Sequence, residues 1–253
     1  MMNIIEGILE KINQAVRLDF GNILSESFEL FKKTWIHGFI LQLVLFIIML
    51  PLLIVIYAPI FTLLIAQARS GHVDPEALSG IFVGMSFFYI IFLIVAIFAI
   101  SAIQFALNAG FFRMMKKLDF NETVQTADLF YFFKTSYFSK TFLLVLASFF
   151  IALIAVLLCY VPIFYVMVPL SYFGFVFAFN PELSINDIIK ISFKLGNKKW
   201  LISFGLMIVA SLMSQIVGLI LCGIGVLFTA AFVYHPFYII YKSVIGFENQ
   251  TNS

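Results

Sequence analysis

The fold of this chain is decided by residues 38–68, which read GFILQLVLFIIMLPLLIVIYAPIFTLLIAQA. This stretch contains no Asp, Glu, Lys, Arg or His, and Tyr57 is its only titratable side chain. A bilayer core about 30 Å thick is crossed by roughly 20 apolar residues of helix. Residues 38–68 therefore predict a transmembrane helix, and we expect Pro51 and Pro59 to kink it, or Pro59 to end it.

Three further runs, at 81–112, 141–180 and 201–241, also lack Asp, Glu, Lys and Arg. The last two are each long enough for two spans, divided near Tyr160-Val161-Pro162 and near Cys222-Gly223-Ile224-Gly225. Hydrophobic residues make up 63% of the chain and charged residues 11%, which excludes a soluble domain with its ~25% charged residues. We predict an all-α polytopic membrane bundle, residues 1–253 as one domain, with six transmembrane helices at about 36–58, 82–112, 141–159, 162–179, 201–221 and 224–241.

The basic residues are distributed unequally between the two sides of this topology. Six spans place residues 1–34, 113–140, 180–199 and 242–253 on one side, where fourteen of the fifteen Lys and Arg residues fall. Only Arg69 falls on the other side. Because cytoplasmic loops are enriched in Lys and Arg, we expect both termini in the cytoplasm.

Residues 1–34, which precede the first span, carry apolar residues at helical spacing, from Ile4 and Ile5 to Ile12 and Val16, with charged residues between them. This pattern is typical of an amphipathic helix that lies in the membrane interface. A charged stretch of this length before the first apolar run is also unlike a cleavable signal peptide.

Similar segments precede the predicted hairpins. Ser27-Phe28-Glu29-Leu30-Phe31-Lys32-Lys33-Thr34-Trp35 matches Ser192-Phe193-Lys194-Leu195-Gly196-Asn197-Lys198-Lys199-Trp200 at five of nine positions, and 130–137 is a weaker copy. Arg17-Leu18-Asp19-Phe20 likewise resembles Lys117-Leu118-Asp119-Phe120. Fixed offsets of this kind predict three repeat units, at about 17–115, 116–180 and 181–246, each with an amphipathic elbow helix and a transmembrane hairpin. The alternative is that basic, aromatic elbows look alike by composition.

A family resemblance rests on four features: these elbows, the Val161-Pro162 pair after the third span, the Ser192-Phe193-Lys194-Leu195 segment and the predicted sixth helix. The chain resembles, from about Asp19 to Gly246, bacterial six-helix membrane proteins of unknown function and the membrane domain of glycerophosphoryl diester phosphodiesterases. The resemblance implies a membrane fold and a location in a bacterial inner membrane, which we expect for this chain. It does not imply hydrolase activity, because the metal-binding carboxylates and histidines of the catalytic barrel have no counterpart here.

The sequence offers little for catalysis. The predicted topology separates the three histidines, His37, His72 and His235, and Asp74 and Glu76 flank a proline that favours a turn. No phosphate-binding loop, dinucleotide fingerprint or nucleophile elbow occurs. We therefore expect no enzyme activity, no metal and no cofactor. The net charge of +2 is too small to indicate that the protein binds nucleic acid.

Neutral polar residues within the spans are the candidates for a ligand site. Gln104, Asn108, Gln215 and His235 could line a polar groove, or could form hydrogen bonds between helices. His235 is the sharpest of them, because an ionisable residue at membrane depth is a functional candidate. A structural role beside Tyr234 and Tyr238, with a carbonyl one turn earlier as acceptor, is the alternative.

Other candidates lie near the membrane surface. Lys32, Lys33, Lys198 and Lys199 could contact anionic lipids, or serve only as topology signals. Trp35, Tyr137 and Trp200 are expected as interfacial anchors. Cys159 and Cys222 fall at predicted external turns, where they could form a disulfide or remain buried thiols.

Three functions are compatible with these features. The first is a non-enzymatic accessory, scaffold or partner-binding protein in lipid or envelope homeostasis, with membrane lipids and a membrane protein as partners. The second is a carrier or flippase-like protein for a lipid or apolar solute, and the third is a membrane enzyme that acts on lipid headgroups. A lateral opening lined by Gln104, Asn108, Gln215 and His235 would favour the carrier, and a closed bundle would favour the partner-binding protein.

Overall fold

The computed structural model describes residues 2–71, 87–158, 160–221 and 223–247. All regular structure in these ranges is helical. The elements are α1 (Met2–Gln14), α2 (Phe20–Ser70), α4 (Phe87–Asp119), η1 (Thr126–Phe133), α5 (Thr135–Leu157), α6 (Val161–Phe179), α7 (Ile185–Lys198), α8 (Trp200–Ile220), α9 (Gly225–Thr229), η2 (Ala230–Val233) and α10 (Tyr234–Val244). The prediction of an all-helical fold is confirmed.

Five of these helices are long and apolar enough to cross a membrane. They lie at Phe20–Arg69, Phe87–Asp119, Ser136–Leu157, Val161–Phe179 and Trp200–Ile220. The predicted sixth span, 224–241, is divided among α9, η2 and α10. α10 has 11 residues, or about 16 Å of helix, and its residues from His235 to Tyr241 are buried. A sixth crossing is therefore not confirmed.

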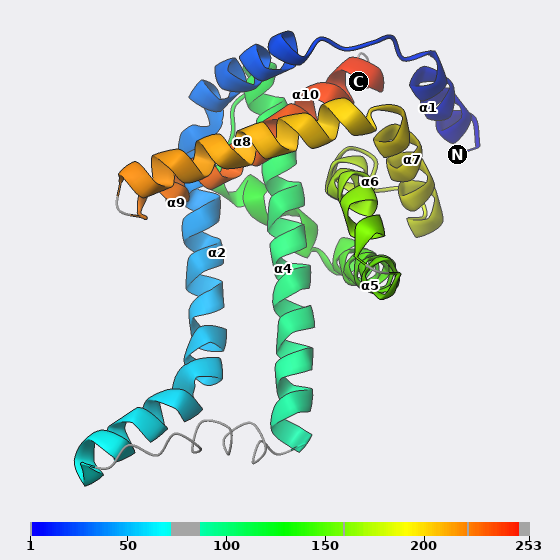
Figure 1. Ribbon diagram of the computed structural model, residues 1–253. Helices are drawn as coiled ribbons and strands as arrows, with labels where there is room; N and C mark the ends of the chain where they lie inside the picture. The colour runs from blue at the N-terminus through cyan, green and yellow to red at the C-terminus, as the bar shows by residue number, and fades with distance from the viewer. Residues whose placement is uncertain (1, 72–86, 159, 222, 248–253) are drawn as a thin grey trace.

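The helices leave a shared core in different directions. Figure 1 shows α2 and α4 running side by side down the view, α8 crossing near their upper end, and α5 nearly end-on. α2 packs on α4, α9, η2 and α10, whereas α4 also packs on η1, α5 and α6. α4 therefore joins the α5–α6 hairpin to the rest of the structure.

Pro51 and Pro59, the two predicted proline sites, lie inside the continuous helix α2, and Pro169 lies inside α6. A proline has no N–H, so the carbonyl four residues earlier loses its helical donor. Pro59 releases the carbonyl of Val55 in this way, and the Tyr89 hydroxyl of α4 donates to it at 2.8 Å. Pro169 releases the carbonyl of Tyr165, and Trp200 Nε1 donates to it at 3.0 Å.

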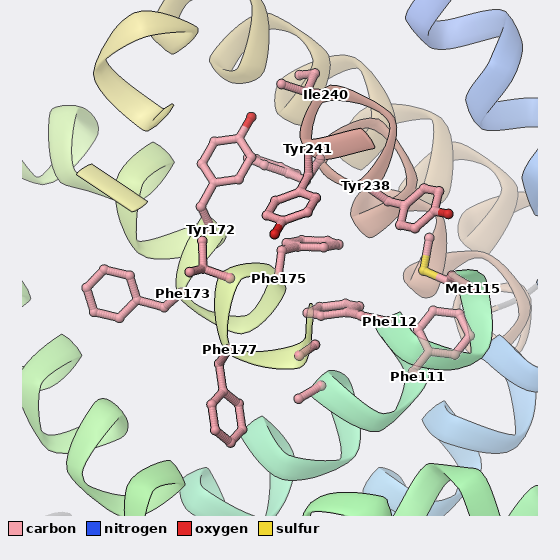
Figure 2. Packing of buried hydrophobic residues seen from close by; sticks show 14 of the residues in the cluster. Phe111, Phe112, Met115, Tyr172, Phe173, Phe175, Phe177, Tyr238, Ile240 and Tyr241 are labelled. Carbon is pink, nitrogen blue, oxygen red and sulfur yellow. The ribbon is translucent and has the colours of Figure 1, made fainter. Parts of the chain in front are cut away.

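The buried core lies where α4, α6 and α10 meet, and aromatic rings fill it (Figure 2). Phe112 of α4 stacks on Phe175 of α6 with 3.9 Å between ring centroids. Tyr172 packs edge-on against Phe237 of α10, with centroids 5.2 Å apart. Stacked and edge-on ring pairs contribute about 0.5–1.5 kcal/mol each beyond their buried area. The rings therefore fix how the three helices approach one another.

The three predicted elbows differ in form. The first is the start of α2 and continues into the span without a break, the second is the short η1, and the third is α7, which Lys199 separates from α8. The two tetrapeptide copies also differ. Asp19 caps the start of α2 by accepting from the N–H of Asn22 at 2.8 Å, whereas Asp119 ends α4. The threefold repeat is therefore not confirmed and stays a prediction.

The predicted amphipathic helix within 1–34 includes α1, whose apolar side packs on protein. Ile12 has no exposed surface, Ile8 is 6% exposed, and the partner element is α7. The α1–α7 pair is tied to the end of the chain, because Lys11 Nζ donates to the carbonyl of Ile245 at 3.0 Å. The first and last helices are therefore neighbours.

We expect Gly110→Ala to destabilise the fold. A Cβ at position 110 would lie 2.1 Å from the carbonyl oxygen of Leu129 in η1, so α4 and η1 would have to separate. Overpacking of this kind costs about 1–3 kcal/mol, and denaturant unfolding in detergent measures it. Gly7→Ala is the control, since a Cβ at position 7 would meet nothing within 4 Å; an equal loss in both variants would contradict the close approach.

We also expect an acid-dependent loss of stability at Asp128. Burial alone would raise the pKa of its carboxyl, but the N–H of Gln125 and the Lys117 ammonium, 2.9 Å away, leave the pKa below its ordinary value. The stabilisation is therefore complete above the unfolded pKa of about 3.9 and lost as the pH falls through the lower folded value.

Asp128→Asn should reduce the free energy of unfolding by about 1 kcal/mol at pH 7, as the loss of a helix cap does. The difference from the unsubstituted protein should shrink toward pH 3. Glu29→Gln is the control, because its pair with Lys32 is 67–68% exposed and contributes little. A difference at Asp128 that stays constant with pH would contradict this account.

Candidate functional site

The chain between α1 and α2 and the junction of α7 and α8 lie at the same end of the structure (Figure 1). An open hollow, which we call the basic cleft, is lined by residues of both segments. Its volume is about 800 Å³. Arg17, Lys198 and Lys199 form its cationic side, and Asp19 is the carboxylate beside them. Its apolar side consists of Leu18, Phe20, Leu201 and Ile202. The cleft is therefore amphipathic, with an excess of positive charge.

Both lysines of the basic cleft bind the end of α1. Lys198 Nζ donates to the carbonyl of Asn13 at 3.1 Å, and Lys199 Nζ donates to the carbonyls of Val16 and, at 3.4 Å, Ala15. Carbonyls at the end of a helix lack helical donors and carry partial negative charge. The two ammonium groups therefore hold α1 against the α7–α8 junction.

The cations of the cleft differ in exposure. Lys199 is 6% exposed, and its burial, followed by the charge of Lys198, lowers the pKa of its ammonium below the ordinary value. Arg17 and Lys198 are exposed, and within the described parts of the chain Arg17 makes no hydrogen bond or ion pair. An anion in the cleft would oppose both effects on Lys199 and give Arg17 a partner.

Lys32 and Lys33, the other two predicted lipid contacts, lie away from the basic cleft. Lys32 Nζ pairs with Glu29 at 2.6 Å, and Lys33 Nζ donates to Asn121 Oδ1 at 3.1 Å. Lys33 lines a separate hollow of about 250 Å³ that also contains Glu26, Glu29, Asp119 and Lys242. The predicted lysines therefore belong to two surfaces, of which only the basic cleft has an excess of cations.

The four residues of the predicted polar groove do not share one hollow. Gln104 lines a groove of about 280 Å³ with Gln42, Met49 and Leu227, between α2, α4 and α9; we call it the glutamine groove. Asn108, one turn further along α4, is half-buried and interacts with Tyr234, while its Oδ1 has no partner among the described residues. Gln215 lies exposed on α8.

His235 lies inside the aromatic core and has no exposed surface. Its Nδ1 is 3.1 Å from the carbonyl of Ala231, and its Nε2 is 2.7 Å from the hydroxyl of Thr34. Because a carbonyl only accepts, Nδ1 carries the proton and Nε2 needs a donor. The single hydroxyl proton of Thr34 therefore goes to Nε2 at 2.7 Å and not to the carbonyl of Leu30 at 3.1 Å. The imidazole thus connects α10 to the elbow part of α2, and the expected carbonyl acceptor one turn earlier is present.

The three predicted anchors lie at or near the starts of apolar segments. Trp35 is 42% exposed on α2, Tyr137 stacks on Tyr131 with ring centroids 5.8 Å apart, and Trp200 begins α8 and donates to Tyr165. Trp200 and Tyr137 therefore have protein partners as well as an apolar ring.

Some residues of these sites are not predicted as site residues by the sequence. In the sequence, Arg17 is only one of the basic residues expected on the cytoplasmic side. Because Arg17 and Lys198 are far apart along the chain, no sequence pattern indicates that they line one cleft. Gln42 lines the glutamine groove together with Gln104, and Thr34 supplies the donor to His235. Tyr238 and Lys242 both bind Asp119, at 2.9 and 2.6 Å, and join α10 to α4.

Nothing in the described residues gathers three or more His, Cys, Asp or Glu side chains into a metal site. His72, Asp74 and Glu76, as well as Cys159 and Cys222, lie outside the described residues. Neither the carboxylate turn nor the pairing of the cysteines has been tested, and both stay predictions.

Comparison of this chain with models of known protein families, with curated proteins and with solved structures gives no match. The resemblance to six-helix bacterial membrane proteins therefore stays a prediction, and the function has to be argued from the geometry of the molecule itself.

We expect Thr34→Val to destabilise the core. Valine has the shape of threonine but no donor, so Nε2 of the buried His235 would lose its partner. An unsatisfied buried acceptor costs about 1–3 kcal/mol, which denaturant unfolding measures. Thr62→Val is the control, because Thr62 lies exposed and donates only to the Pro59 carbonyl of its own helix. Equal losses in the two variants would contradict the role of Thr34.

Proposed function

We propose that this chain is a non-enzymatic accessory or scaffold protein that binds a membrane-protein partner in the bacterial inner membrane. The proposal includes the topology predicted from the sequence, with six crossings in three repeated units and both termini in the cytoplasm. A role in lipid or envelope homeostasis belongs to the same proposal.

The filled core carries this proposal. His235 has no exposed surface, and rings of Phe31, Phe111 and Phe232 surround it with centroids 5.4–6.4 Å away. Gln215 lies exposed on α8 and does not line the hollow that contains Gln104. A carrier needs a continuous route past such polar groups, whereas a scaffold needs a rigid body with surfaces for contact.

The long helices supply surfaces of the required kind. On α2, Ile54 is 67% and Phe61 60% exposed, and on α4, Phe88 is 80% and Val95 61% exposed. Helices associate in a membrane through van der Waals packing against a second helix, and these side chains are free to make such contacts. α2 and α4 extend beyond the core that the other helices share (Figure 1), so a partner helix could reach both.

The glutamine groove supports a carrier or flippase-like function as the second candidate. Gln42 and Gln104 lie within an apolar hollow of about 280 Å³, where their amides could bind a lipid ester or a polar group on an apolar solute. In this second function α2 and α4 would form the walls of the pathway.

We expect purification in a mild detergent to recover a membrane-protein partner in fixed stoichiometry, seen by native mass spectrometry. Ile54→Ala combined with Phe61→Ala should reduce that recovery at least about fivefold, because losing anchor side chains from an interface costs about 1 kcal/mol or more. Leu212→Ala combined with Ile216→Ala on α8 is the matched control, since these side chains are 54% and 55% exposed.

A partner lost equally from both double variants, or no partner in fixed stoichiometry, would contradict the scaffold. Transfer of a fluorescent lipid between leaflets of reconstituted vesicles distinguishes the second function. Transfer above that of protein-free vesicles, abolished by Gln104→Leu, would favour the carrier over the scaffold.

A further inference from the structure

The basic cleft combines two properties that few single ligands satisfy. Its cationic side carries Arg17, Lys198 and Lys199 against one carboxylate, Asp19. Asp19 is already engaged in the cap of α2, where Oδ1 accepts from the N–H of Asn22. The cleft therefore presents positive charge that the described part of the protein does not neutralise.

The apolar side of the cleft points to a ligand with a hydrocarbon part. Leu201, 79% exposed at the second residue of α8, and Phe20, 39% exposed at the first residue of α2, both line it. Leu201 stands at the start of a candidate membrane span, whereas Phe20 begins the amphipathic elbow part of α2. The charged and apolar residues of the cleft thus meet where the headgroup region of a membrane would border its hydrocarbon core. Trp200 lies next to Leu201, and aromatic rings of this kind are typical of that border.

The sign and arrangement of the charges select the class of lipid. A phosphodiester fits Arg17, because a guanidinium can donate two parallel hydrogen bonds to phosphate oxygens. A zwitterionic phospholipid would bring its own ammonium close to three cations, whereas an anionic phospholipid such as phosphatidylglycerol brings none. A free phosphate would leave Leu18, Phe20, Leu201 and Ile202 exposed to water.

We propose that the basic cleft binds one anionic phospholipid, with the phosphate at Arg17 and Lys198 and the acyl chains along Leu201 and Ile202. The lipid would lie between the α1–α2 connection and the α7–α8 junction. Since Lys198 and Lys199 also hold the end of α1, the bound headgroup would share the groups that dock the first helix. This site is separate from the α2–α4 surface and does not depend on the scaffold proposal.

The test is the lipid occupancy of the purified full-length chain in nanodiscs of phosphatidylglycerol or phosphatidylcholine, read by native mass spectrometry after release into detergent. We expect one retained phosphatidylglycerol and none of the phosphatidylcholine. Each cation near a membrane surface contributes about 1 kcal/mol to binding an anionic lipid. Arg17→Gln combined with Lys198→Gln should therefore weaken retention about 30-fold.

Two further variants keep the result interpretable. Arg17→Gln alone should weaken retention about fivefold, and it removes no bond within the described protein. Lys190→Gln combined with Lys194→Gln removes two exposed charges from α7 that do not line the cleft, and it should retain the lipid like the unsubstituted chain. Circular dichroism and thermal unfolding check that each variant is folded.

Several outcomes would overturn the proposal. If the Lys190→Gln, Lys194→Gln control weakened retention of phosphatidylglycerol equally, the protein would attract negative charge without a defined site. If phosphatidylcholine were retained equally, the cleft would have no preference for an anionic headgroup. Binding of inorganic phosphate to lipid-depleted protein with the same dependence on Arg17, and without retention of phosphatidylglycerol, would assign the cleft to a free anion. If folded Arg17→Gln retained phosphatidylglycerol as well as the unsubstituted chain, the phosphate would not bind at Arg17 and the proposed site would be wrong.

Discussion

The structure depends on donors for backbone carbonyls that its apolar helices cannot satisfy themselves. In hydrocarbon, an unpaired carbonyl costs several kcal/mol because no water is present to donate. The chain supplies these donors from neighbouring elements, as Tyr89 does for Val55 and Trp200 does for Tyr165. Each donor also joins two helices, α4 to α2 and α8 to α6. The prolines inside the helices therefore create the acceptors by which the helices are held together.

The same requirement explains the positions of several basic residues. Lys198 and Lys199 donate to carbonyls at the end of α1, and Lys11 donates to Ile245. Lysines that the topology places near the membrane surface thus have a structural role there. Arg17 differs from these three lysines, because it lines the basic cleft beside two other cations and makes no hydrogen bond or ion pair among the described residues. Its guanidinium can therefore bind a ligand in the cleft, whereas the ammonium groups of these lysines already stabilise the fold.

The helical class and the positions of five apolar helices could be predicted from the sequence, because the absence of charge over 20 or more residues has one physical solution. The interruption of the predicted sixth span could not, since 224–241 also lacks Asp, Glu, Lys and Arg. Its packing against Phe112 and Tyr172 makes it part of the core. Likewise, His235 and Thr34 are 201 positions apart. Pairs of this kind come from tertiary packing and leave no periodic signal.

The contact between Lys11 and Ile245 has a consequence for biogenesis. Its two residues are 234 positions apart, so α1 leaves the ribosome long before its anchoring carbonyl has been synthesised. Until α7 has been synthesised, the isoleucines of α1 also lack their docking surface, and the membrane surface or a chaperone can cover them. The amphipathic character of α1 suits both stages, first as a helix adsorbed on lipid during translation and then as the element that closes the finished protein.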